Sequence, residues 1–202
     1  METELKLDKI IILDFGSQYS HLICRRIRDA KVFCEIYPYN LTSDQIKELS
    51  PNGIVFSGGP ASVYAENSPK PDKKIFELGI PILGICYGHQ IIVDNFKGKV
   101  KRSHTREYGK AILTIDDNSD LFINLDKSIN CWMSHGDVAE KTPSGFKVLA
   151  HTESSFAAAI GNQEKKFYGI QFHPEVVHTE HGFEILKNFS INISKAKYIK
   201  LL

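Results

Sequence analysis

The sequence predicts an α/β fold: an open, mostly parallel sheet with helices on both faces, plus a smaller mixed or antiparallel extension. In the first half of the chain, short apolar runs alternate with amphipathic stretches, as in parallel strands joined by helices. In the second half, short strand-like runs are separated by turn residues. The length of 202 residues is enough for one sizeable core. We therefore expect one domain over residues 1–191, with residues 192–202 as a tail or as the start of a connector.

The first element is a buried strand over Lys9–Asp14, which is a run of apolar, mostly β-branched residues. Ser20–Ala30 carries apolar residues with charges between them, which predicts an amphipathic helix. The other elements expected in this half are a strand at Val32–Tyr37, a helix at Ser43–Leu49 capped by Thr42 or Ser43, a strand at Gly53–Ser57, a helix at Asp72–Leu78, a strand at Pro81–Ile85 and a further apolar-periodic segment at Gly88–Phe96.

The second half is expected to be mainly strands, closed by one helix from about Gly182 to Ser190. The expected strands are Ala111–Ile115, Ser128–Met133, Phe146–His151, Ala157–Gly161 and Phe167–Phe172.

Composition and charge exclude several classes of function. The net charge of +1 does not indicate a basic surface that would bind nucleic acid. No stretch reaches the roughly 18 apolar residues of a membrane span. The basic run around Lys99–Lys101–Arg102 is expected to be a solvated face. The four cysteines form no C-x-x-C pair, so we expect no disulfide framework, no metal site and a reducing, cytoplasmic setting.

A candidate nucleophile follows the fourth expected strand. Gly84-Ile85-Cys86-Tyr87-Gly88 leads from an apolar strand into a helix, which is the context that a G-x-nucleophile-x-G turn requires. Such a turn strains the backbone of the central residue, and the glycines remove Cβ atoms that would clash. Cys86 is then set at a helix N-terminus, whose partial positive charge favours the thiolate. The other cysteines lack this context and are expected to be buried and inert: Cys24, Cys34 and Cys131.

A thiolate nucleophile needs an acid/base partner, and His173 is the best candidate. It follows the apolar strand that contains Gly169 and Ile170, and it is followed by Pro174 and Glu175. Residues two apart on extended backbone point the same way, so the Glu175 carboxylate can orient the imidazole. Pro174 stiffens the link between them.

A candidate oxyanion site is the turn Ser57-Gly58-Gly59-Pro60, which follows the third expected strand and opens at the same sheet edge as Cys86. The backbone N–H groups of Gly59 and Tyr87 are the natural donors to an oxyanion. The turn also matches the start of an S-G-G-x-D-S pyrophosphatase loop. We reject ATP binding here, because the aspartate is missing and Pro60 removes an N–H that a phosphate cradle would use.

Three motifs together resemble the class I, triad-type glutamine amidotransferases. They are S-G-G-P (57–60), G-I-C-Y-G-H-Q (84–90) and G-I-Q-F-H-P-E (169–175). A finer resemblance, over about residues 9–191, is to the amidotransferase portion of GMP synthases. It rests on I-L-D-F-G-S-Q-Y (12–19), the arginine-rich stretch 25–28, S-G-G-P-A-S-V-Y-A-E (57–66), R-E-Y-G (106–109) and W-M-S-H-G-D (132–137). The resemblance implies a class I glutamine amidotransferase-like fold.

The resemblance also implies a role for each matching residue. Cys86 would form a γ-glutamyl thioester, His173 and Glu175 would complete the triad, and Gly59 and Tyr87 would be the oxyanion donors. The residues implied to bind the substrate glutamine are Gln90, through its side chain, and Ser134, Gly136 and Asp137, largely through their backbone. His89 is expected to be a packing residue, and His135 is given no proton-transfer role.

The function implied is hydrolysis of L-glutamine to glutamate and ammonia. The ammonia would serve the ATP-dependent amination of xanthosine monophosphate (XMP) to GMP on an ATP pyrophosphatase domain or subunit of GMP synthase. No cofactor is expected in this chain, whereas ATP and Mg²⁺ are expected in that partner. No nucleic-acid or membrane partner is expected.

Two alternatives remain open from the sequence. One is the glutaminase component of another amidotransferase, such as that of anthranilate or carbamoyl-phosphate synthesis. The other is a non-catalytic docking module that keeps the same fold.

Overall fold

A single mixed sheet forms the centre of the computed structural model, which describes residues 7–198 except for the side chains of residues 104–107. Within these residues the sheet has nine strands in the order β2-β1-β3-β4-β9-β8-β7-β5-β6. The parallel strands are β1 (Lys9–Asp14), β2 (Phe33–Pro38), β3 (Gly53–Phe56), β4 (Ile82–Ile85) and β9 (Phe167–Ile170). The antiparallel strands are β5 (Lys99–Ile115), β6 (Ser128–Lys141), β7 (Lys147–His151) and β8 (Ala159–Asn162). The predicted fold class is confirmed, and the antiparallel extension is continuous with the parallel sheet.

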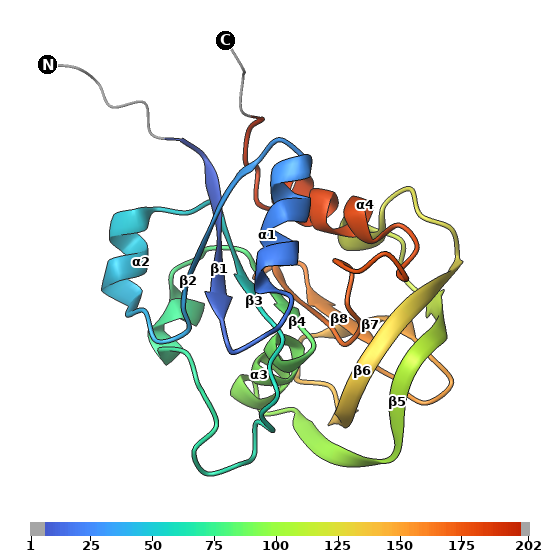
Figure 1. The fold of residues 1–202 in the computed structure, drawn as a ribbon. Helices are drawn as coiled ribbons and strands as arrows, with labels where there is room; N and C mark the ends of the chain where they lie inside the picture. The colour runs from blue at the N-terminus through green and yellow to red at the C-terminus, as the bar shows by residue number, and fades with distance from the viewer. Residues whose placement is uncertain (1–6, 199–202) are drawn as a thin grey trace, which may run out of the picture.

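Both faces of the parallel part are covered, because its strands are apolar on both sides. In β1, Ile10 and Ile12 belong to one buried cluster and Ile11 and Leu13 to another, which is the period of two that a strand dictates. The first cluster includes side chains from α1 (Ser20–Asp29) and α4 (Gly182–Lys187), and the second includes side chains from α2 (Ser43–Leu49) and α3 (Tyr87–Asn95). Figure 1 shows α1 and α4 side by side on the sheet.

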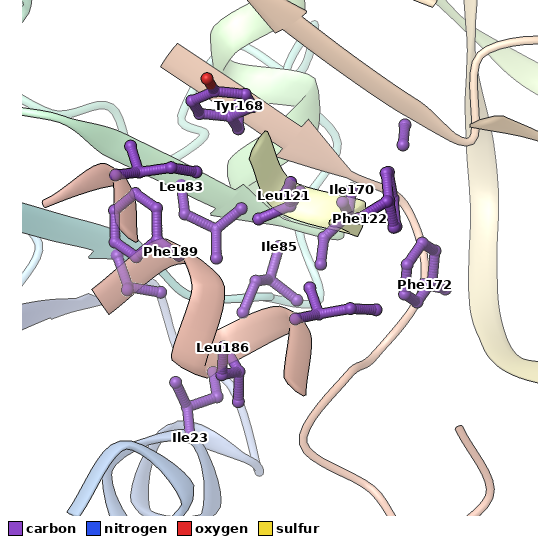
Figure 2. Packing of buried hydrophobic residues seen from close by; sticks show 14 of the residues in the cluster. Ile23, Leu83, Ile85, Leu121, Phe122, Tyr168, Ile170, Phe172, Leu186 and Phe189 are labelled. Carbon is purple, nitrogen blue, oxygen red and sulfur yellow. The ribbon is translucent and has the colours of Figure 1, made fainter. Parts of the chain in front are cut away.

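The first cluster joins α1 and the C-terminal helical segment to the middle of the sheet. In Figure 2, Leu83 and Ile85 of β4 point toward Leu186 and Phe189 from the C-terminal helical segment. Ile23 of α1 lies next to Leu186 in the same view. The strand that leads to Cys86 therefore shares one buried cluster with α1 and with the C-terminal helical segment.

Several expected helices differ in extent from the observed ones. Thr42 is the N-cap of α2, in a capping box with Gln45. The helix expected at Asp72–Leu78 is a short 3₁₀ helix over Lys73–Glu77, with the Asp72 side chain as its N-cap. The closing helix continues beyond α4 as a π-helical segment, Asn188–Ile193.

The largest difference from the expected elements is the hairpin of β5 and β6. The strand expected at Ala111–Ile115 begins at Lys99, and the one expected at Ser128–Met133 runs on to Lys141. Pairing between the two strands stabilises their additional length, including the charged segment around Lys101, where apolar alternation is absent. Figure 1 shows the hairpin at the edge of the molecule opposite α2.

The segment after the closing helix packs on the domain as far as the structure describes it. Ala196 is buried in the first cluster, and the Lys197 N–H donates to the Asp8 carboxylate at 3.0 Å. Residues 199–202 of the expected tail lie outside the described residues. The boundary at residue 191 stays a prediction. None of the helices within residues 7–198 has the length and apolar character needed to cross a membrane.

Candidate active site

Cys86 occupies a strained turn between β4 and α3. Its φ and ψ of 53° and −101° lie outside the common regions for an L-residue, and such strain costs about 1–3 kcal/mol. The Cys86 N–H donates to the Ile170 carbonyl at 2.8 Å, so β9 helps to hold the turn. This strained nucleophile turn is the one that the sequence predicts.

The two flanking glycines are required by the close approach of the backbone. A Cβ added at Gly84 would clash with the backbone of Gly88, and a Cβ added at Gly88 would clash with the Phe56 carbonyl of β3. The Gly88 N–H donates to the Ser57 carbonyl at 3.2 Å, so the turn after β3 and the start of α3 are in direct contact. The same glycines that permit the turn therefore bring the Ser57–Pro60 loop against the nucleophile.

Gly88→Ala is expected to lower the free energy of unfolding by about 1–3 kcal/mol, the usual cost of overpacking. Helix propensity alone favours alanine over glycine, so a loss of stability in Gly88→Ala would report the clash with Phe56. Urea unfolding followed by circular dichroism measures it, with Gly136→Ala as the control, because a Cβ there meets nothing within 4 Å. Equal stability of both variants would contradict the close approach.

His173 and Glu175 form a buried pair beside Cys86. His173 Nδ1 lies 2.7 Å from Glu175 Oε1, and the glutamate is fully buried. Burial lowers the pKa of His173, but hydrogen bonds and charge interactions with Cys86 and Glu175 outweigh it and raise the pKa to about 10. The imidazole is therefore protonated at neutral pH and can supply a proton to a leaving group.

The backbone around His173 is fixed by β6. The His173 N–H donates to the Trp132 carbonyl at 3.0 Å, and the Thr179 hydroxyl donates to the His173 carbonyl at 2.6 Å while accepting from the Trp132 N–H at 3.0 Å. Arg26 Nε donates to the Glu175 carbonyl at 3.1 Å, and the ring of Tyr19 lies edge-on to that of His173, with 5.4 Å between centroids.

Sequence reasoning gave no individual role to these supporting residues. Tyr19 and Arg26 lie in segments that carry the finer resemblance, which is a signal that could have found them. Thr179 lies in no motif, and its contact with β6 spans 47 residues of sequence, so no local pattern indicates it.

A cavity of about 770 Å³ opens above Cys86 and brings the predicted residues together. All of them except Glu175, which lies buried behind His173, line its wall: Gly59, Cys86, Tyr87, Gln90, Ser134, Gly136, Asp137 and His173. Arg102 also lines the cavity, and its side chain is exposed there, which agrees with the expected solvated face. Tyr64 and Tyr108 contribute exposed aromatic rings to the same wall.

The substrate-binding candidates contact one another and the nucleophile turn. Gln90 Nε2 donates to the Asp137 carbonyl at 3.2 Å, and Cys86 Sγ lies 3.7 Å from the Ser134 carbonyl. A Cβ added at Gly59 would meet the Phe15 carbonyl at 2.6 Å, so the loop passes close to the end of β1. His89 is fully buried under the site, and burial together with the charge of His135 lowers its pKa to about 3, which suits the expected packing role. The individual roles in catalysis and in binding stay predictions.

Residues 11–193 match the family model described as glutamine amidotransferase class-I. The chain belongs to the class I glutamine amidotransferase family. The predicted assignment as a glutamine amidotransferase is thus confirmed, and the strained cysteine and its His–Glu pair lie in a domain of that family.

Several relatives of this amidotransferase carry the name GMP synthase [glutamine-hydrolyzing]. It is 56% identical over 188 residues to the one from Caldicellulosiruptor saccharolyticus, covering 93% of this chain and 37% of the relative. This chain is also 53% identical over 191 residues to the GMP synthase from Brachyspira hyodysenteriae, covering 95% of this chain and 37% of that relative. The predicted resemblance to GMP synthases is confirmed, and the chain spans little more than a third of the length of these relatives.

Solved structures agree with the fold of this amidotransferase. A protein from Thermoplasma acidophilum, described as a subunit of GMP synthase, superposes with a TM-score of 0.81 at 27% identity and covers 94% of both chains. A glutamine amidotransferase structure from Thermotoga maritima gives a TM-score of 0.70 at 19% identity, covering 84% of this chain and 76% of that one, which supports the fold alone.

Proposed function

We propose that this chain hydrolyses L-glutamine to glutamate and ammonia through a γ-glutamyl thioester on Cys86. The observation that carries the proposal is the cavity in which a cysteine on a strained turn meets the buried His173–Glu175 pair. A thiolate at this position is an activated nucleophile, and a paired histidine is the usual partner for it.

In the first half-reaction, the Cys86 thiolate attacks the side-chain carbonyl carbon of glutamine and a C–S bond forms. The Gly59 and Tyr87 N–H groups stabilise the oxyanion, which exists only once the carbonyl has been attacked. Protonated His173 gives its proton to the amide nitrogen, the C–N bond breaks and ammonia leaves. Glu175 keeps the imidazole oriented throughout.

In the second half-reaction, neutral His173 takes a proton from water, and the oxygen attacks the thioester carbonyl. The C–S bond breaks and returns the thiolate, so that glutamate leaves and the His173 proton is restored. Gln90, Ser134, Gly136 and Asp137 would hold the amino-acid end of the substrate. No cofactor takes part in either step on this chain.

The ammonia released here would be used by an ATP pyrophosphatase partner, with ATP and Mg²⁺, to aminate XMP to GMP. The names of the relatives support XMP as the acceptor of the ammonia, over the acceptors used in anthranilate or carbamoyl-phosphate synthesis. Because the chain spans little more than a third of these relatives, the partner could be a further domain. The Thermoplasma acidophilum protein, which matches this chain over nearly its whole length and is described as a subunit, supports a separate partner instead.

The test measures glutamate release from glutamine by the chain, alone and with an ATP pyrophosphatase part of a relative, XMP and ATP. A glutamine-mimicking diazo-ketone is added in parallel, and labelled peptides are identified by mass spectrometry. We expect glutamate release, higher with the partner and its substrates, and labelling at Cys86. An absence of both release and labelling under all conditions would favour the docking module.

A further inference from the structure

The loop that carries the oxyanion donor Gly59 is tied to the hairpin by a single carboxylate. Ser62 Oγ donates to Asp137 Oδ2 at 2.5 Å, and Tyr64 OH donates to Asp137 Oδ1 at 2.7 Å. Hydrogen bonds from hydroxyls to a carboxylate at these distances are among the strong ones. The two loop residues lie more than 70 positions before Asp137, so the contact joins separate parts of the fold.

Asp137 also contacts the helix that follows the nucleophile. Its carbonyl accepts from Gln90 Nε2 at 3.2 Å, and its side chain is nearly buried, with 8% of the residue exposed. One residue of β6 therefore contacts both segments that supply the oxyanion donors, the loop after β3 through its carboxylate and α3 through its carbonyl.

The first part of this loop is fixed independently. The Ser57 N–H donates to the Leu13 carbonyl at 3.1 Å, and the Ser57 hydroxyl accepts from the Phe15 N–H at 2.9 Å. The link from Gly59 to Ser62 is short and contains Pro60, whose ring fixes φ and restricts the residue before it. A displacement of Ser62 and Tyr64 would therefore be transmitted to the peptide at Gly59.

We propose that the Asp137 carboxylate, with Ser62 and Tyr64, positions the oxyanion loop, and that these are positioning residues for glutamine hydrolysis. The inference rests on the proposed function and extends it, because the resemblance implies for Asp137 only a contact with the substrate, largely through its backbone. The carboxylate of Asp137 already accepts one hydroxyl on each oxygen, and both hydroxyls come from the loop.

The two roles of Asp137 predict different kinetics. The oxyanion donors bind most strongly in the transition state, so a misplaced loop lowers kcat and leaves KM for glutamine nearly unchanged. A carboxylate that bound the substrate ammonium would mainly raise KM when neutralised. Removing the Tyr64 hydroxyl would then have little effect, because that hydroxyl would not touch the substrate.

The experiment compares Asp137→Asn, Tyr64→Phe and Ser62→Ala in the glutamate-release assay, with Tyr198→Phe as the matched control. Tyr198 is an exposed tyrosine outside the cavity. We expect Tyr64→Phe and Asp137→Asn each to lower kcat about tenfold with KM unchanged. This loss is smaller than the roughly hundred- to thousandfold loss known for removal of a whole oxyanion donor. Because the Tyr64 hydroxyl and the Asp137 carboxylate take part in one interaction, the double variant Tyr64→Phe/Asp137→Asn should have a kcat no lower than that of Asp137→Asn alone.

A second readout does not depend on turnover. Amide hydrogen exchange over residues 57–66 should be faster in Tyr64→Phe than in the unaltered protein, and unchanged in Tyr198→Phe. Unchanged exchange in Tyr64→Phe would overturn the inference even if the protein hydrolyses glutamine. A large rise in KM for Asp137→Asn, with Tyr64→Phe fully active, would overturn it as well. Faster exchange in a protein that releases no glutamate would instead refute the proposed function and, with it, the catalytic role of the contact.

Discussion

Cys86→Ala is expected to abolish glutamate release while leaving the fold intact. Loss of the nucleophile removes the covalent step, and in a comparable hydrolytic triad this costs on the order of a millionfold in kcat. The backbone strain at this position is unchanged, because alanine is also an L-residue with a Cβ. Stability should therefore stay close to that of the unaltered chain.

The measurement is glutamate release together with thermal unfolding. Cys24→Ala serves as the control, because Cys24 is also a buried free thiol but lies in α1, away from the cavity wall. When it is combined with an ATP pyrophosphatase part of a relative, as in the proposed function, Cys86→Ala should still support amination from added ammonium. Glutamate release by Cys86→Ala at the rate of the unaltered protein would exclude the thioester route.

His173→Ala is expected to reduce turnover almost as far, and Glu175→Gln to leave a measurable residual rate. In the proposed mechanism the histidine transfers the protons, whereas the glutamate orients it and favours its charged form. In template triads, loss of the carboxylate is the milder lesion. Glutamine preserves the volume of the fully buried Glu175, so the effect reports charge more than packing. Removing that charge should also lower the pKa of His173 from about 10.

The losses in His173→Ala and Glu175→Gln are ranked by kcat for glutamate release. The pKa of His173 is measured by NMR titration in the unaltered and Glu175→Gln proteins. His21→Ala, an exposed histidine on α1, is the control. Small and equal losses from His173→Ala and Glu175→Gln would contradict the triad. A His173 pKa that stays near 10 in Glu175→Gln would show that Cys86 alone sustains it.

The parts of the site that the sequence could predict are those determined by neighbouring residues. The turn at Cys86 depends on glycines two positions away on each side, and the His173–Glu175 pair is separated by one proline, so both can be recognised within a few residues. The parallel strands could also be predicted from local sequence, because most of them are continuous apolar runs.

The parts that could not be predicted depend on contacts between distant segments. The outer half of the β5–β6 hairpin is charged, and only pairing across the hairpin makes it a strand. The bonds of Asp137 to Ser62 and Tyr64, and of Thr179 to Trp132, join residues 47 to 75 positions apart. A motif at positions 132–137 indicates that these residues matter, but it does not show which side chain they meet.

The place of β9 in the sheet has a consequence for the synthesis of the protein. β4 pairs directly with β9, and the paired residues Ile82 and Phe167 are separated by more than 80 positions of chain. Contacts of such long separation form late in folding, because the intervening loop must close first. The segment after β9 also carries His173, so a growing chain that has exposed Cys86 still lacks the histidine that would activate it. We therefore expect an unfinished chain at the ribosome to be unable to consume glutamine, since the thiol gains its partner only once the last strand is in place.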